Sequence, residues 1–164
     1  MEHARMGLKL KNTYVLECHD RNGNFKWREE FYNAVVTQGL NHALNSEFKG
    51  GAQISSWYVG LKGTGSPAAG DTLASHATWS EITAYSGTRP ALTLGTVSAG
   101  SVSNTLSKAV FTMNDTYDCY GAFVCSATSG TSGTLYGAGD IPTHRSGDSG
   151  DTITMTVTLT AASA

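Results

Sequence analysis

Residues 25–61 read FKWREEFYNAVVTQGLNHALNSEFKGGAQISSWYVGL and decide what kind of fold this chain adopts. The stretch starts and ends with strand-like segments and carries a helical pattern between them. Its apolar residues recur at helical spacing: Val35, Val36, Leu40, Leu44 and Phe48. The pattern predicts one amphipathic helix over about residues 33–48, capped by Asn33 and ended by Gly50, with its apolar stripe packed on a sheet. Gly39 costs this helix roughly 1 kcal/mol unless close packing requires it.

The rest of the chain predicts strands joined by turns. Residues 8–18 alternate in polarity, and Asn22-Gly23 is typical of a hairpin that returns along residues 25–31. Threonine alternates with large apolar residues over 152–160, which predicts a strand with one buried face. Further strands are expected at 54–61 (the most apolar, and so central), 79–84, 91–97, 101–105, 109–113, 117–127 and 134–136, with a short helical turn at 71–76. The prediction is a mainly β, antiparallel β-sandwich or jelly-roll-like fold with one helix.

Composition limits the classes of protein and of partner. The chain has 164 residues, 15% of them charged, a net charge of -2 and 19 glycines. The length predicts one domain, residues 8–164, and 40% hydrophobic residues argue against disorder. A chain without excess positive charge is not expected to bind nucleic acid or an anionic membrane. Neither a signal peptide nor a membrane-spanning segment is expected.

Three cysteines, Cys18, Cys119 and Cys125, make an odd number. A secreted disulfide framework favours even numbers and closer spacing, so the thiols are expected to be reduced and buried. Cys119 and Cys125 are six residues apart on one predicted strand and are expected to share a face of it.

Residues 147–150, Gly-Asp-Ser-Gly, match the nucleophile motif of trypsin-like proteases. That chemistry needs a histidine base, an aspartate that orients it and an oxyanion hole. The family's local sequence around the histidine is missing here, and Asp151 stands where a glycine normally follows the motif. We interpret the motif as a turn that leads into the last strand, and we expect no catalytic residue and no enzymatic activity.

Metal and phosphate sites are also not expected. The five histidines have no partner at ligand spacing, and structural zinc needs four such ligands. Asp115 and Asp118 lie near a turn but provide too few oxygens for calcium. Residues 60–65 are rich in glycine but lack the order of a phosphate-binding loop. The sequence therefore predicts no metal, no cofactor and no cofactor-binding residue.

Aromatic residues could form a stacking surface for a sugar or a base. The candidates are Trp27, Trp57, Tyr58, Trp79 and Tyr85. Packing in the core is the expected fate of most of them.

The order of several motifs resembles a family of tailed-bacteriophage virion proteins. The resemblance rests on residues 23–27 (GNFKW), 32–41 (YNAVVTQGLN), 57–61 (WYVGL), 69–72 (AGDT) and 84–90 (AYSGTRP), with shorter matches from Phe111 to Gly137. It implies a non-enzymatic structural component, most similar to capsid decoration (cement) proteins. Such a protein would bind the major capsid protein on the outside of the capsid as a homo-oligomer, after assembly in the host cytoplasm. The alternative is a tail or head-fibre component, or a module that binds host-surface glycans.

Residues 1–12 have two interpretations. The segment is basic at Arg5, Lys9 and Lys11 and could serve as an N-terminal arm that reaches a neighbouring subunit. The alternative is an ordinary chain terminus followed by the start of the first strand.

Overall fold

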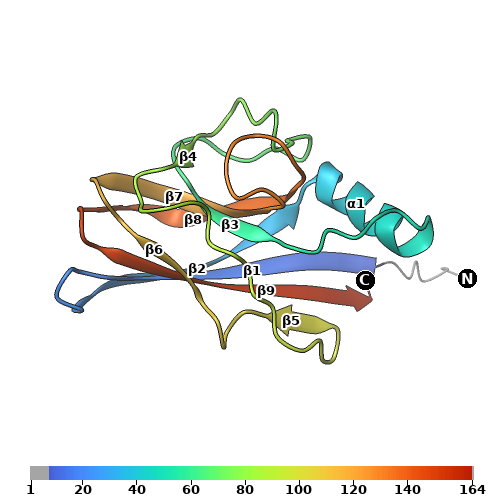
Figure 1. Cartoon of the computed structure of the whole chain (residues 1–164), viewed down its shortest axis with the longest axis horizontal. Coiled ribbons are helices and arrows are strands. Elements are labelled where there is room, and N and C mark those ends of the chain that lie inside the picture. Colours follow the sequence, from blue (N-terminus) through green and yellow to red (C-terminus); the bar gives the residue numbers. More distant parts are fainter. Residues whose placement is uncertain (1–7, 164) are drawn as a thin grey trace, which may run out of the picture.

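The computed structural model describes residues 8–163 (Figure 1). Within these residues, nine strands and one helix follow each other in this order: β1 (Leu8–His19), β2 (Phe25–Val35), α1 (Thr37–Phe48), β3 (Tyr58–Lys62), β4 (Glu81–Ile82), β5 (Ser101–Ser103), β6 (Ala109–Thr112), β7 (Tyr117–Cys125), β8 (Leu135–Gly147) and β9 (Thr152–Ser163). The predicted fold class, mainly antiparallel β with a single helix, is confirmed. Of the candidate arm, residues 1–7 lie outside the described residues, whereas residues 8–12 belong to β1.

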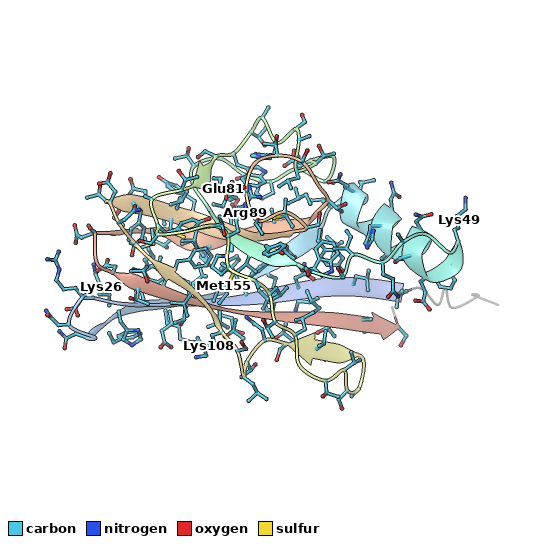
Figure 2. The ribbon with its side chains drawn as sticks, in the orientation of Figure 1. Lys26, Lys49, Glu81, Arg89, Lys108 and Met155 are labelled. Carbon is cyan, nitrogen blue, oxygen red and sulfur yellow. The ribbon has the colours of Figure 1, made fainter. Side chains whose placement is uncertain are left out.

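The strands form two layers that are consistent with a β-sandwich. One layer has the order β2-β1-β9, and β5 and β6 both pair with the far edge of β9. The other has the order β4-β3-β7-β8. The end of β2 passes from the first layer to the second, where Ala34 pairs with Ala138 and Val35 with Gly137 (Figure 1). In Figure 2, Lys26 marks the hairpin end of the molecule and Lys49 the opposite end, beside α1.

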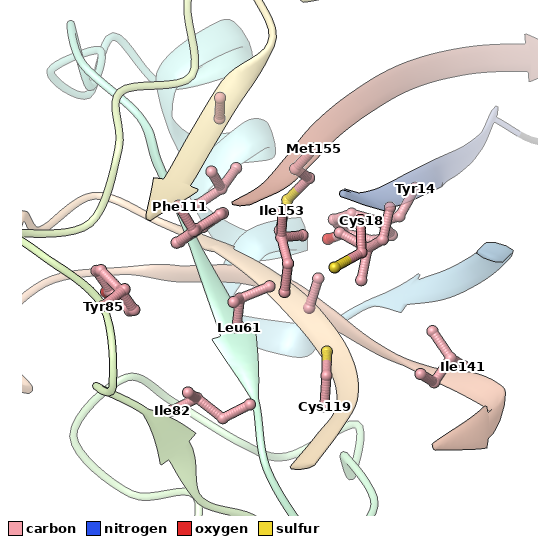
Figure 3. Packing of buried hydrophobic residues seen from close by; sticks show 14 of the residues in the cluster. Tyr14, Cys18, Leu61, Ile82, Tyr85, Phe111, Cys119, Ile141, Ile153 and Met155 are labelled. Atoms are coloured by element: carbon pink, nitrogen blue, oxygen red, sulfur yellow. The ribbon is translucent and has the colours of Figure 1, made fainter. Parts of the chain in front are cut away.

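The alternation of β1 and β9 fills the space between the layers. These strands pair over their whole length, so inward residues of one lie opposite inward residues of the other. The buried pairs are Cys18–Ile153, Leu16–Met155 and Tyr14–Val157. Leu61 and Cys119 meet them from the other layer (Figure 3). The predicted alternation of residues 152–160 is confirmed, except that Leu159 is only partly buried.

Irregular pairing of β7 with β8 makes the expectation for Cys119 and Cys125 wrong. All three cysteines are free and buried, as predicted. The register of β7 against β8 shifts between Cys119 and Gly121, where two steps along β7 face five steps along β8, from Arg145 to Asp140. Beyond this irregularity the side chains of β7 no longer keep the alternation that Cys119 begins. Cys119 therefore packs between the layers, whereas Cys125 joins a second apolar cluster with Phe123 and Leu135. Leu73 and Trp79 also belong to that cluster.

The helix starts four residues later than predicted, and Asn33 is not its cap. Strand β2 continues to Val35, and Val36 holds the N-cap position without a side-chain hydrogen bond. Val35 and Val36 are β-branched and buried, and these properties favour a strand. Asn33 instead donates from its amide to the hydroxyl of Tyr14 at 2.7 Å.

Several other segments differ from prediction. Residues 91–97 form no strand and make one isolated bridge, from Ala91 to Tyr58, and the strand expected at 79–84 is reduced to Glu81–Ile82. Strand β3 begins at Tyr58 and lies one strand from the edge rather than in the centre, because only the two-residue strand β4 flanks its outer side. Strand β8 covers 13 residues where only 134–136 were expected, since its glycines and Pro142 conceal the pattern. Residues 71–76 form a hydrogen-bonded turn between Thr72 and Ser75 rather than a helical turn.

Candidate interaction surface

Helix α1 presents its apolar stripe to solvent, which contradicts the predicted packing. Leu40, Leu44 and Phe48 are 40%, 55% and 75% exposed. Gly39 is the buried residue of the helix. The helix lies at one end of the sandwich rather than across a sheet (Figure 1), so the sheets bury only its first turn.

Close contact with β8 fixes this position. A Cβ at Gly39 would collide with the backbone carbonyl of Tyr136. The same carbonyl accepts a hydrogen bond of 3.1 Å from the amide of Val36, and the side-chain oxygen of Gln38 accepts one of 2.7 Å from the amide of Leu135. Close packing therefore requires glycine at position 39. The contacts lie in the first half of the helix, and its second half projects from the sandwich.

The helix ends as the two glycines predict. Gly50 adopts a φ of 67°, which is unfavourable for other residues. The amide of Gly51 then donates to the carbonyl of Asn45 at 2.9 Å. The chain turns back there toward β3.

A hollow of about 270 Å³ lies between α1 and the sandwich. Trp57 stands in it, with its ring edge-on to His42 at 5.6 Å and to Tyr136 at 5.4 Å between centroids. A second hollow of about 250 Å³ is lined by Leu10, Val97 and Val102 among others. Tyr136 and Leu159 line both hollows, so the two are neighbours.

We call this region the α1 end surface: Leu40, Leu44, Phe48 and the two hollows. Its titratable groups are His42 and Tyr136, and burial raises the pKa of Tyr136, which keeps that phenol neutral at physiological pH. No lysine, arginine or carboxylate lines either hollow among the described residues. Leu40, Leu44 and Phe48 do not line either hollow; they form a separate exposed apolar stripe on α1. Exposed apolar surface of this kind is suited to docking against another protein.

The sequence indicated this surface only in part. The helical spacing of Leu40, Leu44 and Phe48 identified the right residues but the wrong partner, because spacing does not show what covers a stripe. The contributions of Leu10, Val97 and Val102 come from strands and loops far apart in sequence, and no local signal connects them.

The motif at residues 147–150 forms a turn between β8 and β9, as interpreted. Gly150 has a φ of 94°, and the carbonyl of Ser149 accepts a hydrogen bond of 3.0 Å from Arg21. Residues 60–65 form the end of β3 and a loop. The side chain of Asp115 accepts a hydrogen bond from the amide of the next residue, Thr116, and that of Asp118 accepts one from the hydroxyl of Ser146 on β8.

The aromatic candidates pack in the protein as expected. Trp27, Trp79 and Tyr85 are buried, and Trp57 and Tyr58 are partly buried. Within residues 8–163, no three His, Cys, Asp or Glu side chains are grouped to hold a metal ion. The one helix in this range is too short to span a bilayer.

No protein-family model matches the chain, and no curated protein matches it.

Proposed function

We propose that this protein is a non-enzymatic virion component of a tailed bacteriophage, a decoration protein that binds the outer surface of the capsid. It stabilises contacts between subunits of the major capsid protein. The observation that supports this function is the α1 end surface, an apolar face that no other element of the described chain covers. The order of sequence motifs, which resembles virion structural proteins, supports the choice of partner.

The small apolar area of the α1 end surface favours an assembly of many copies. Burying a whole leucine or phenylalanine side chain stabilises an interface by about 1.5–3 kcal/mol. Leu40, Leu44 and Phe48 are already partly buried, so each contributes less than this. Association costs an estimated 4–15 kcal/mol or more. One such surface therefore binds weakly by itself, and repeated copies on a lattice increase the strength of binding without new contacts. We propose that the protein acts as a homo-oligomer on the capsid, without nucleic acid or membrane as a partner.

Sedimentation of capsids tests this function. Purified protein is mixed with expanded capsids that lack it, and the bound fraction is measured. A Leu44→Asp, Phe48→Asp variant should lose binding, because two carboxylates would be buried without partners. Both side chains are exposed, so the variant should unfold at the same urea concentration as the wild type.

The matched control is Leu106→Asp, which adds a carboxylate at a side chain that is 98% exposed, in the turn between β5 and β6. It should bind as the wild type does. Equal binding by the double variant would exclude the α1 end surface as the docking site. Wild-type protein that does not bind capsids would contradict the proposed function itself.

The number of copies of the protein per virion distinguishes a capsid decoration protein from a tail component. Quantitative mass spectrometry of purified virions should find hundreds of copies per particle. A count of only a few copies would favour the alternative, a tail or head-fibre component.

A further inference from the structure

A buried ion pair on the outer face of the second layer defines a separate site. Lys62 ends β3 and is completely buried, and its ammonium lies 2.8 Å from Oδ1 of Asp140 on β8. Both residues pair in register with Gly121 of β7, which lies between them. A glycine has no side chain to separate the two, so they meet above it.

Two backbone carbonyls also hold the ammonium. It donates to the carbonyl of Gly63 at 2.9 Å and to the carbonyl of Gly65. An ammonium has three N–H donors, so these two hydrogen bonds and the ion pair with Asp140 leave it little freedom to move. Asp140 is therefore held in one position while its side chain remains 37% exposed.

A pocket of about 420 Å³ opens beside this carboxylate. Tyr120 and His144 stand on its wall with their rings stacked, 4.9 Å apart between centroids and 10° from parallel. Ser66 and Thr143 contribute hydroxyl groups, and Pro142 contributes an apolar edge. The pocket thus combines a fixed hydrogen-bond acceptor, hydroxyls and an aromatic face.

Charge decides which ligands fit. Lys62 offsets the negative charge of Asp140, so the pair attracts a cationic ligand weakly. No lysine or arginine is among the described residues that line the pocket, so an anion finds no partner there. The exposed oxygen of a carboxylate accepts hydrogen bonds from hydroxyl groups, and the aromatic pair offers an apolar surface. These properties fit a neutral polyhydroxyl compound.

We propose that this pocket binds a neutral sugar ring. Two adjacent hydroxyls of the sugar donate to Asp140, and the apolar face of the ring packs on Tyr120 and His144. The site is separate from the α1 end surface, and the proposal does not depend on the capsid function. Tyr120 and His144 are not among the aromatic residues that the sequence suggested as a stacking surface. Those residues pack in or against the two apolar cores.

Nuclear magnetic resonance titration tests the proposal with three probes, the methyl α-pyranosides of D-glucose, D-galactose and D-mannose. At least one should shift the resonances of Tyr120, Asp140 and His144 and saturate in the millimolar range. Tyr120→Ala should weaken that binding about tenfold, equivalent to about 1.4 kcal/mol. This variant leaves the ion pair in place.

The matched control is Tyr32→Ala, which removes an aromatic ring that is 59% exposed on β2. It should bind the sugar as the wild type does. The absence of saturable shifts with all three probes would overturn the proposal, as would shifts confined to other residues. Binding that is equal in Tyr120→Ala and the wild type would also overturn it.

Discussion

Lys26 and Asp151 connect the two turns at the end of the sandwich opposite α1, with Nζ of Lys26 2.6 Å from Oδ2 of Asp151. Asp151 is almost completely buried and also accepts hydrogen bonds from the amide of Asp148 at 3.0 Å and the hydroxyl of Tyr117 at 3.2 Å. Lys26 follows the first hairpin, and Asp151 precedes β9. This carboxylate therefore fixes β2 and β9 relative to each other.

The pair predicts loss of stability in acid. Burial by itself would raise the pKa of Asp151, but the hydrogen bonds from Lys26, Asp148 and Tyr117 hold it below its usual value. Because the pKa of Asp151 is lower in the folded protein, its carboxylate stabilises the fold fully at pH values above the unfolded-state pKa of about 3.9. This stabilisation is lost as the pH falls through the folded-state pKa. The hydrogen bond to Asp151 raises the pKa of Lys26, so the contribution of the lysine is lost only in alkali, as pH rises above about 10.4.

Asp151→Asn should therefore reduce the free energy of unfolding at pH 7 by about 1–3 kcal/mol. It should also flatten the dependence of that free energy on pH between 2 and 5. Urea unfolding at a series of pH values measures both effects. Asp115→Asn, at an exposed carboxylate, should leave the dependence unchanged, and equal curves for the wild type and Asp151→Asn would refute the assignment.

Arg89 explains part of the motif at residues 84–90. Its buried guanidinium donates two hydrogen bonds, of 2.7 and 2.6 Å, to Glu81 and two more to the carbonyls of Ala127 and Gly130 (Figure 2). The hydrogen bonds to Glu81 raise the pKa of Arg89. The residue connects β4 to the loop between β7 and β8.

Arg89→Lys should therefore destabilise the protein, although it keeps the charge. An ammonium cannot reproduce the planar fork of the guanidinium, and about 2–4 kcal/mol should be lost. The control is Arg28→Lys at an exposed pair with Glu30, which should change stability by less than about 1 kcal/mol. Urea midpoints compare the two, and similar midpoints would show that the buried contacts of Arg89 contribute little.

Gly39→Ala should destabilise the protein, although alanine favours a helix by about 1 kcal/mol. The new methyl group would collide with the carbonyl of Tyr136 and force α1 away from β8, at a cost of about 1–3 kcal/mol. Gly70→Ala is the control, because a Cβ there meets no atom within 4 Å. Thermal unfolding distinguishes the two variants. An increase in the melting temperature of Gly39→Ala would mean that helix propensity outweighs this contact.

The thiols should be unreactive in the folded protein. Burial raises the pKa of Cys18, that of Cys119 to about 12, and that of Cys125. At pH 8, a thiol reagent such as DTNB should modify no cysteine in native protein and all three after denaturation. A Leu44→Cys variant is the control and should add one thiol that reacts at once. Rapid modification of a native cysteine would show that the core opens readily.

The sequence alone determined which segments become strands where polarity alternates, as in residues 8–18 and 152–160. Each strand buries alternate side chains, so a period of two is visible without knowledge of the partner. It also determined the turns at Gly23 and Gly150, because a positive φ excludes most other residues. The presence of a helix before Gly50 was also predictable, because the helical spacing of apolar residues and the glycine that ends the helix are local signals.

Only the tertiary structure decided which partner each segment meets. Strand pairing extends β2 through Val35 and fixes β8, whose glycines carry no pattern of their own. Irregular pairing of β7 with β8 separates Cys119 from Cys125. The position of α1 at the end of the sandwich leaves Leu44 in solvent, and the register over Gly121 brings Lys62 to Asp140. Periodicity shows that one face of a segment is apolar, but long-range packing decides whether the chain itself or another molecule covers it.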